Sequence, residues 1–556
     1  MFKKLNLISK IPTVSLSTFN LCMAVWLTIG LNFLFFEKLA ALTPHSGFQY
    51  FLFIIASAGV IISVYNLIFQ MIHWKINAKL FSFFWITLGG LSAYFVNSLG
   101  AVINSDQIQN MMQTDHREAF DLVNLNFLIW VILFIALPLM VLFIVKIKPE
   151  TIKPILFKKM SHIVASVLIL MGLVFAYYVD YAAIFRENRD LKGMISPQNV
   201  VGSSWSYYKK QRPQENLPLI HYGEDAHLIQ NATNSTKPKI MLLVVGETAR
   251  AESFSLNGYA KQTNPELSKL DLINFSNVSS CGTATAVSVP CMFSGMTRDR
   301  YDSKLAHHRE GLLDIAQRAG YKVTWIDNNS GCKDVCNRVE QFKIPTALKD
   351  KWCSPDGECF DEILVDSLKD YLKQLPKNDQ QSHLIVLHQM GSHGPAYYKR
   401  SPTEFQRFKP TCDTNAIQGC SQEELLNSYD NSILYTDHVL SQLIGTLKEK
   451  SQYQTAFWYL SDHGESTGES GLYLHGAPYA IAPSQQTHIP MFMWFSQQWQ
   501  ENQPSDVNCL SQMKKSTLSQ DNLFPTLINL LGIKTNTADP HLNMLQQCQK
   551  TTAPRA

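Results

Sequence analysis

The stretch KIMLLVVGET, residues 239–248, decides the fold of the larger part of this chain. Its continuous apolar run ends in a glycine and a carboxylate, which is typical of a strand buried on both faces of a parallel sheet. Similar runs recur between helical patterns farther along. We therefore expect an α/β domain with a mostly parallel central sheet flanked by helices, each run being one parallel strand. The further runs are Lys322–Ile326, His383–Leu387, Ala456–Leu460 and Ile489–Phe495.

Reactive side chains follow four of these predicted strands. Sites in open α/β sheets lie outside the carboxyl ends of the strands, so the fold would bring these side chains together. One such residue alone is more often a helix cap, but four strand ends favour a site. Carboxylate with imidazole favours zinc or another divalent transition metal, and the adjacent Asp462 and His463 are the strongest pair. The other candidates are Glu247, Asn329, Ser330, Lys333, His393, Glu465 and His475.

A nucleophile is sought in the segment CGTATAVSVPC, residues 281–291. Its small residues let the backbone approach a ligand closely, and its threonines can begin a helix whose N-terminus attracts a phosphate. A metal-bound threonine loses its proton more readily and can attack phosphorus. An ordinary helix cap beside a disulfide explains the segment equally well, and spacing alone leaves both interpretations open.

The first part of the chain is strongly apolar and predicts a membrane domain. A bilayer-spanning helix needs about 20 apolar residues. Five stretches meet this length, and the first four contain no Asp, Glu, Lys or Arg. A signal peptide would be shorter than the first stretch, and four further spans follow it. The stretches are Val14–Phe36, Phe48–Ile72, Leu80–Ile103, Leu122–Val145 and Ile163–Phe185.

Basic residues between the spans predict the orientation. Lys3, Lys4 and Lys10 precede the first span, and lysines also fill the second-to-third and fourth-to-fifth loops, whereas the alternate loops hold only Lys38 and Arg117. The N-terminus is therefore expected in the cytoplasm and the C-terminal domain outside.

Cysteine placement points to the same side of the membrane. Of eleven cysteines, ten lie after residue 240, mostly at short separations, which is typical of a disulfide-bonded domain in an oxidising compartment. A structural zinc site is the alternative, but paired CxxC spacing is absent from the sequence. Pairing sequence neighbours gives Cys281–Cys291, Cys332–Cys336, Cys353–Cys359 and Cys412–Cys420, which leaves Cys509 and Cys548.

Three regions follow from these patterns: a five-helix membrane domain at 1–185, a polar bridging segment at 186–238 and a catalytic domain at 239–556. In the outward loop between the third and fourth spans, Asn110, Thr114 and Glu118 lie four residues apart, which would place them on one helix face. That face could meet a lipid head group or be an ordinary amphipathic surface. A net charge of +3 over 556 residues gives no reason to expect nucleic acid.

Four long motifs resemble one family, the bacterial lipid A phosphoethanolamine transferases, which include the mobile colistin-resistance enzymes. The resemblance covers nearly the whole chain and implies a membrane domain joined to a domain of the alkaline phosphatase/sulfatase superfamily, in the bacterial inner membrane with its catalytic part periplasmic. The motifs are VVGETARAESFSLNGY (244–259), CGTATAVSVPCMFSGM (281–296), HQMGSHGPAYYKR (388–400) and SDHGESTGESGLYLHGAPY (461–479).

The resemblance also implies a role for each candidate. Glu247, Thr285, Asp462 and His463 match a primary zinc site in which Thr285 is the nucleophile, and Glu465 matches a residue near a second metal position. His393 and His475 match residues beside the transferred phosphate. One tightly bound zinc is implied, with room for a second. The head-group and membrane-side contacts correspond to Asn329, Ser330, Lys333, Asn110, Thr114 and Glu118.

The implied reaction is a two-step exchange. Thr285 would take phosphoethanolamine from phosphatidylethanolamine and pass it to a lipid A phosphate, with ping-pong kinetics and lower binding of cationic polymyxins. Membrane lipids are the expected partners, and a monomer is expected. The rival interpretations are transfer to a core sugar, synthesis of glycerol-phosphate polymers, and a receptor with a degenerate phosphatase-like domain. The last is disfavoured because all four primary-site residues are present.

Overall fold

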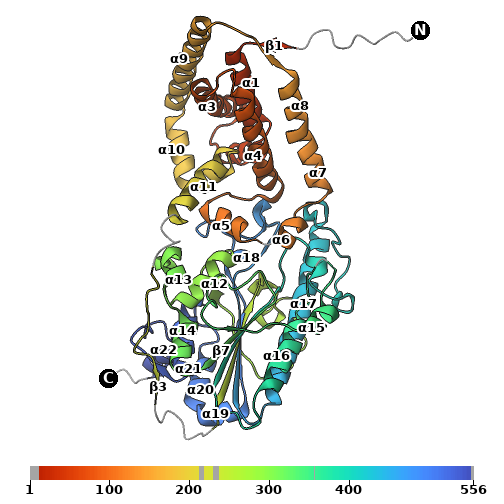
Figure 1. Ribbon diagram of the computed structural model, residues 1–556, viewed down its shortest axis with the longest axis vertical. Coiled ribbons are helices and arrows are strands. Elements are labelled where there is room, and N and C mark those ends of the chain that lie inside the picture. Colours follow the sequence, from red (N-terminus) through yellow and green to blue (C-terminus); the bar gives the residue numbers. More distant parts are fainter. Residues whose placement is uncertain (1–11, 115, 212–217, 230–236, 356, 553–556) are drawn as a thin grey trace, which may run out of the picture. The chain divides into compact units, whose positions relative to one another are not determined.

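The computed structural model describes residues 12–114, 116–211, 218–229, 237–355 and 357–552 (Figure 1). Lys3, Lys4 and Lys10, which carried part of the orientation argument, lie outside these ranges. The chain forms two compact units. One comprises Met1–Ile108 with Val123–Ser206, and the other comprises Gln109–Leu122 with Tyr207–Ala556. Most of the connection between the third and fourth spans, residues Gln109–Leu122, therefore belongs by its contacts to the second unit.

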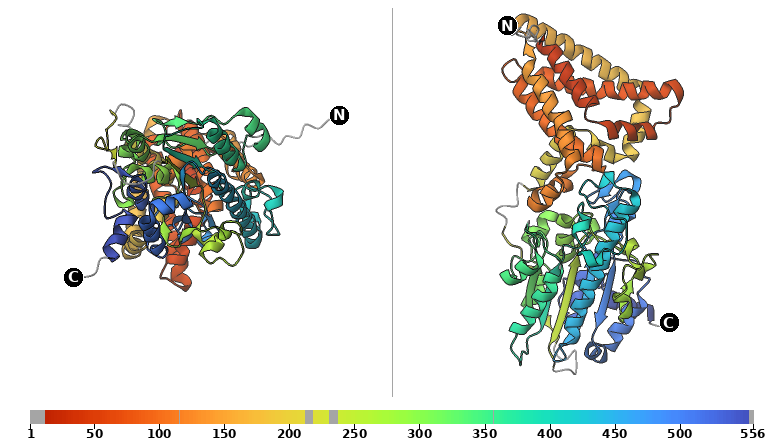
Figure 2. Two further views of the ribbon diagram at one scale, coloured as in Figure 1. Left: turned by 90° about the horizontal axis from the view of Figure 1, so that it is seen from below. Right: turned by 90° about the vertical axis from the view of Figure 1, so that its right-hand side faces the viewer.

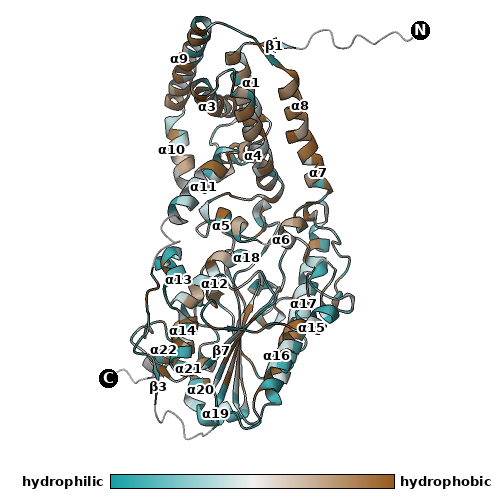
Figure 3. Ribbon diagram, in the orientation of Figure 1, coloured by the Kyte–Doolittle hydropathy of each residue, from teal (hydrophilic) through white to brown (hydrophobic). Residues whose placement is uncertain are grey.

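The first unit is built from apolar helices, which Figure 3 colours as hydrophobic along most of their length. Among the described residues, four helices are long and apolar enough to cross a membrane, and one bent pair would make a fifth span. This composition identifies a membrane-anchored protein. The four are α3 (Gly47–Ile72), α4 (Ala78–Leu99), the continuous α7–η1–α8 (Leu125–Ile144) and α9 (Ile152–Ala176); the bent pair is α1 (Leu16–Ile29) and α2 (Phe33–Leu42).

The first expected span, Val14–Phe36, is not one straight helix. Its two halves, α1 and α2, meet at an angle of 63°. The Asn32 side chain donates to the carbonyls of Leu27 (2.7 Å) and Thr28 (3.1 Å), which stand among the last carbonyls of α1. The amide thus satisfies α1 carbonyls at the point where the chain changes direction.

The fifth span begins earlier than expected. The sequence predicted Ile163–Phe185 because lysines precede residue 163, but α9 already begins at Ile152 and ends at Ala176, and α10 (Tyr178–Glu187) follows separately. Lys159 enters the helix because its amine donates to the His73 carbonyl at 2.9 Å and lies 4.0 Å from the centre of the Trp74 ring. A charged end with such partners can be accommodated beside apolar residues.

The second unit contains a seven-stranded sheet in the order β5-β13-β10-β4-β9-β7-β8. Four expected strands are confirmed as parallel neighbours: β4 (Lys239–Gly246), β7 (Lys322–Asp327), β9 (His383–His388) and β10 (Gln454–Ser461). Short strands complete the sheet, with β8 (Glu340–Gln341) beside β7 and β5 (Ile273–Phe275) beside β13.

The run Ile489–Phe495 was wrongly expected to be parallel. Its strand, β13 (Met491–Phe495), is antiparallel to both β10 and β5. A parallel neighbour needs a crossover that returns the chain from the carboxyl end of one strand to the amino end of the next. Residues 462–490 form no such crossover, since the short helix α18 (Ser484–Thr487) is their one α-helix. The strand β13 therefore starts at the end of the sheet where β10 finishes.

Helices cover both faces of this sheet (Figures 1 and 2). Alternate residues of β4 enter different cores: Met241, Leu243 and Val245 pack in one, and Ile240, Leu242 and Val244 in the other. Burial on both faces explains why the strand is a continuous apolar run. The first core includes α12 (Thr285–Ser294), α14 (Leu312–Arg318) and α21 (Leu523–Leu530), and the second includes α16 (Glu362–Gln374) and α17 (Gln422–Lys448).

Five disulfides join the ten cysteines of the second unit. All five pairs are those obtained by pairing sequence neighbours, including Cys332–Cys336 and the remaining pair Cys509–Cys548. Cys22, in α1, is an unpaired cysteine.

Candidate metal centre and active site

The carboxyl ends of β4 and β10 bring three buried ligand-type side chains together. Glu247 follows β4, and Asp462 and His463 follow β10, its parallel neighbour. The Nε2 atom of His463 lies 3.4 Å from Glu247 Oε1 and 3.4 Å from Asp462 Oδ2. The three side chains are at most 1% exposed. The two carboxylates and one imidazole thus converge on one point, as the strand-end argument predicted.

Thr285 is the first residue of α12 and faces this cluster. Its hydroxyl lies 3.0 and 3.2 Å from the two carboxylate oxygens of Glu247 and 3.3 Å from His463 Nε2. The start of a helix also presents free backbone N–H groups and a partial positive charge, which suit a phosphate. A hydroxyl, a carboxylate that can accept its proton and a helix N-terminus that suits an anion therefore lie side by side.

The donor set fits a bound cation. His463 Nδ1 lies 2.8 Å from the Gly464 carbonyl, which can only accept, so the proton is on Nδ1. Burial lowers the pKa of the His463 imidazole, so its Nε2 directs a lone pair toward two carboxylates. Within the described chain, Asp462 Oδ2 is buried and makes no hydrogen bond. Such a buried acceptor is costly unless a cation satisfies it.

A second group shares His463 and adds Glu465 and His475. Glu465 is fully buried, and both of its oxygens are used: Oε1 accepts from the Tyr397 hydroxyl at 2.6 Å, and Oε2 lies 3.0 Å from His475 Nδ1. Burial and the Glu465 charge raise the pKa of Tyr397 well above its usual range, so its hydroxyl remains a donor. This second carboxylate is satisfied by the protein itself.

The loop after β7 contributes Asn329, which orients Glu247, and the adjacent pair Ser330 and Lys333. Asn329 donates its amide to Glu247 Oε2 (2.8 Å) and to the Gln389 carbonyl (2.7 Å). Its nitrogen is thereby committed to holding Glu247 rather than a substrate. Lys333 Nζ lies 2.9 Å from Ser330 Oγ, so the two expected head-group residues are adjacent.

His393 follows β9 and meets the ring of His475 edge-on, with 5.4 Å between ring centres and 63° between the ring planes. Burial, together with the charges of His475 and Arg400, holds the pKa of His393 well below its usual range. The ring is therefore neutral near pH 7 in the absence of a bound anion, and a phosphate would raise its pKa.

The expected helix face of Asn110, Thr114 and Glu118 is not formed by a single helix. The helix α5 (Ser105–Gln113) ends before Thr114, and α6 begins at His116. The last carbonyl of α5, that of Gln113, faces Lys333 Nζ at 3.4 Å, and the Thr114 hydroxyl bonds back to the Asn110 carbonyl. These contacts satisfy carbonyls at the helix end. The Glu118 side chain lies outside the described part of the chain.

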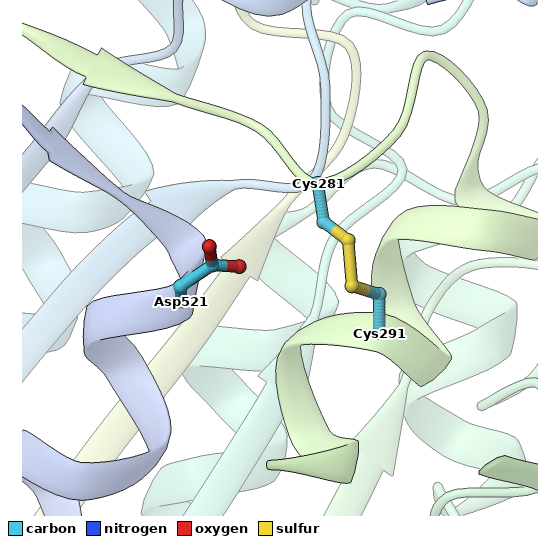
Figure 4. Close-up of side chains that lie close together, drawn as sticks. All are labelled: Cys281, Cys291 and Asp521. Carbon is cyan, nitrogen blue, oxygen red and sulfur yellow. A yellow bond between two sulfur atoms is a disulfide. The ribbon is translucent and has the colours of Figure 1, made fainter. Parts of the chain in front are cut away.

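A third cluster of ligand-type residues is not a metal site. Cys281, Cys291 and Asp521 lie close together, but Figure 4 shows the two sulfurs joined in a disulfide. A disulfide sulfur has no thiolate to offer a cation. The bridge instead ties the start of the nucleophile segment to the middle of α12.

Sequence reasoning missed two supporting residues. Tyr397, which donates to Glu465, lies in a quoted motif but has no ligand chemistry of its own. Asp361 is buried and accepts from the backbone N–H groups of Met390 and Gly391, which fixes the loop after β9. Nothing in the sequence around Asp361 distinguishes it from an ordinary helix-start aspartate.

Comparisons with known proteins agree with this geometry. Residues 239–533 match the Sulfatase family, and residues 61–212 match the family described as Phosphoethanolamine transferase EptA/EptB. The fold and the strand-end site therefore define a membrane-anchored enzyme with a sulfatase-type domain.

Relatives matching nearly the full length specify the family. Phosphoethanolamine transferase EptA of Escherichia coli K12 is 41% identical over 98% of this chain and 99% of its own. Phosphatidylethanolamine transferase Mcr-1 of Escherichia coli is 35% identical over 92% and 94%. The solved structure of lipooligosaccharide phosphoethanolamine transferase A from Neisseria meningitidis superimposes with a TM-score of 0.91 at 34% identity, covering 97% of this chain and 99% of that one. The chain belongs to the EptA family of phosphoethanolamine transferases.

Proposed function

We propose that this enzyme transfers phosphoethanolamine from phosphatidylethanolamine to a lipid A phosphate through a covalent intermediate on Thr285. The observation that carries the proposal is the placement of the Thr285 hydroxyl, at a helix N-terminus, within 3.3 Å of Glu247 and His463. The full-length similarity to EptA and Mcr-1 supports the substrate class.

Zinc is the proposed cofactor, held by Glu247, Asp462 and His463 together with Thr285. A mixed carboxylate and imidazole set suits zinc better than magnesium or calcium. When bound, zinc lowers the pKa of a coordinated hydroxyl and offsets negative charge on phosphate oxygens. Asn329 holds Glu247 in place through its 2.8 Å hydrogen bond.

In the first step, Thr285 Oγ1 attacks the phosphorus of phosphatidylethanolamine. The bond to the diacylglycerol oxygen breaks, and the new bond to Thr285 gives a phosphothreonine ester carrying ethanolamine. The Glu247 carboxylate is placed to receive the threonine proton. Glu465 orients His475 through Nδ1, so a proton carried on His475 Nε2 passes to the departing diacylglycerol oxygen.

In the second step, a lipid A phosphate oxygen attacks the phosphothreonine. The bond to Thr285 breaks, Glu247 returns the proton to the threonine oxygen, and the attacking phosphate gives its own proton to His475 Nε2. We assign Lys333, Ser330 and His393 to the phosphate and head-group contacts, and Asn110, Thr114 and Glu118 to the membrane side. Because diacylglycerol leaves before lipid A reacts, the kinetics should be ping-pong.

The added amine lowers the net negative charge of lipid A. Polymyxins such as colistin are cationic and bind that charge, so the modification should weaken their binding and confer resistance. We place the catalytic region (239–556) in the periplasm, the bridging segment at 186–238 and the membrane domain (1–185) in the inner membrane with its N-terminus in the cytoplasm. The five disulfides of the second unit support an oxidising location.

The test is mass spectrometry of lipid A from a Gram-negative host that expresses either the intact chain or Thr285→Ala. We expect a mass gain of one phosphoethanolamine with the intact chain and none with the variant. Unmodified lipid A with a folded, membrane-inserted parent would overturn the acceptor, and core sugars would be analysed next. Equal modification by the variant would show that Thr285 is not the nucleophile.

A further inference from the structure

The helix that begins with Thr285 contains a proline at position 290. Proline has no backbone N–H, and its ring crowds the carbonyl four residues earlier in a helix. In α12 that carbonyl belongs to Ala286, which directly follows the nucleophile. Ala286 is fully buried, so its carbonyl needs a donor from outside the helix.

Gln109 supplies that donor. Its side-chain Nε2 lies 3.3 Å from the Ala286 carbonyl oxygen, and the glutamine is only 3% exposed. Gln109 is part of α5 and begins the segment Gln109–Leu122, which lies between two candidate membrane spans in sequence but belongs to the catalytic unit by its contacts. We call this segment the clamp.

The far end of the clamp is fixed as well. Asp121 is buried and receives Lys399 Nζ at 3.0 Å and Arg400 Nη2 at 3.2 Å. Arg400 Nε in turn donates to the His393 carbonyl at 2.7 Å. The clamp thus contacts the helix of Thr285 at one end and the loop of His393 at the other.

We propose that Gln109 is a positioning residue for the nucleophile. Its amide holds the first turn of α12, which proline has deprived of a hydrogen bond, and thereby sets the direction of the Thr285 hydroxyl. This inference rests on the proposed function, because it assigns a purpose to the orientation of Thr285. Small displacements of a reacting group lower the rate of the chemical step more than they weaken substrate binding.

Gln109→Leu keeps the size of the side chain and removes the donor. We expect kcat for phosphoethanolamine transfer to fall about tenfold while KM for phosphatidylethanolamine changes little, since a misplaced nucleophile affects the chemical step. Gln107→Leu is the matched control, because the same change is made two residues away on the same helix, and its kcat should stay near that of the parent.

Combining Gln109→Leu with Pro290→Ala gives a double-mutant cycle. The substitution restores a backbone N–H at position 290, which can bond to the Ala286 carbonyl within the helix. Gln109→Leu should then lower kcat less than about twofold in the Pro290→Ala background, because the carbonyl no longer depends on the glutamine. A general loss of stability in Gln109→Leu would not be rescued in this way.

Hydrogen–deuterium exchange of the peptide covering residues 283–295 gives a readout that does not depend on activity. Exchange should rise in Gln109→Leu and return toward the parent level in the double variant. Equal loss of kcat in both backgrounds, together with unchanged exchange, would overturn the positioning role. A parent enzyme that modifies no lipid A would instead overturn the proposed function, and the exchange data would still decide whether Gln109 holds α12.

Discussion

Two carboxylate–imidazole groups lie beyond the carboxyl ends of the strands: Glu247 with Asp462 and His463, and Glu465 with His463 and His475. They differ in which partners satisfy their carboxylate oxygens. In the first, Asp462 Oδ2 is buried and makes no hydrogen bond to any residue that the structure describes, and His463 Nε2 faces both it and Glu247. In the second, each oxygen of Glu465 already has a partner from the protein. Proximity of ligand-type atoms is common to both groups. The unsatisfied Asp462 Oδ2 favours the first group as the one that binds a cation.

The largest effect should come from Asp462→Asn. An amide replaces one of two anionic ligands, so bound zinc should be lost and transfer to lipid A should fall by at least about a thousandfold. Metal per protein, measured by elemental mass spectrometry, is compared with lipid A modification. Glu465→Gln is the matched control and should keep one zinc. An Asp462→Asn enzyme that retains its zinc would contradict the assignment of the first group.

The convergence of these side chains was predictable from the sequence, but the difference between the two groups was not. Asp462 and Glu465 lie three residues apart in one motif and look alike as ligands. Glu465 is satisfied by Tyr397, 68 positions away, and this contact exists only because β9 and β10 end at the same edge. Apolar runs predicted the parallel strands well, since burial on both faces leaves a clear pattern. They failed for β13, because direction depends on the connection and not on the strand.

A smaller loss is expected from His475→Ala. The first group remains intact, so one zinc should stay bound. The departing diacylglycerol oxygen, however, loses the side chain that supplies its proton. Transfer should fall about a hundredfold, a typical effect for a general acid–base residue. Single-turnover measurement of the phosphothreonine intermediate separates the two steps. Loss of the tightly bound zinc in this variant would mean that the two groups act as one site.

Metal titration tests the comparison without changing the chain. Protein stripped by a chelator should bind a first zinc tightly and a second one about a hundredfold more weakly, because the second must displace hydrogen bonds already made to Glu465. Isothermal titration calorimetry measures both steps. If two equivalents of zinc bind with equal affinity, the hydrogen bonds to Glu465 do not weaken zinc binding. The two groups would then not differ as metal sites.

The smallest effect should come from Tyr397→Phe, which converts the second group toward the state of the first. Glu465 Oε1 loses its donor, so a buried carboxylate oxygen is left unsatisfied at a cost of about 1–3 kcal/mol. The thermal midpoint should fall in protein with one zinc and recover as zinc is added in excess, because binding at the second group now satisfies that oxygen. The affinity for the second zinc should rise about tenfold, whereas transfer at saturating zinc should change less than about threefold.

Tyr398→Phe is the control: it removes the neighbouring hydroxyl, which does not bond to Glu465, and should leave both zinc affinities unchanged. If Tyr397→Phe binds the second zinc no better than the parent, the Tyr397 hydrogen bond does not limit metal binding at Glu465.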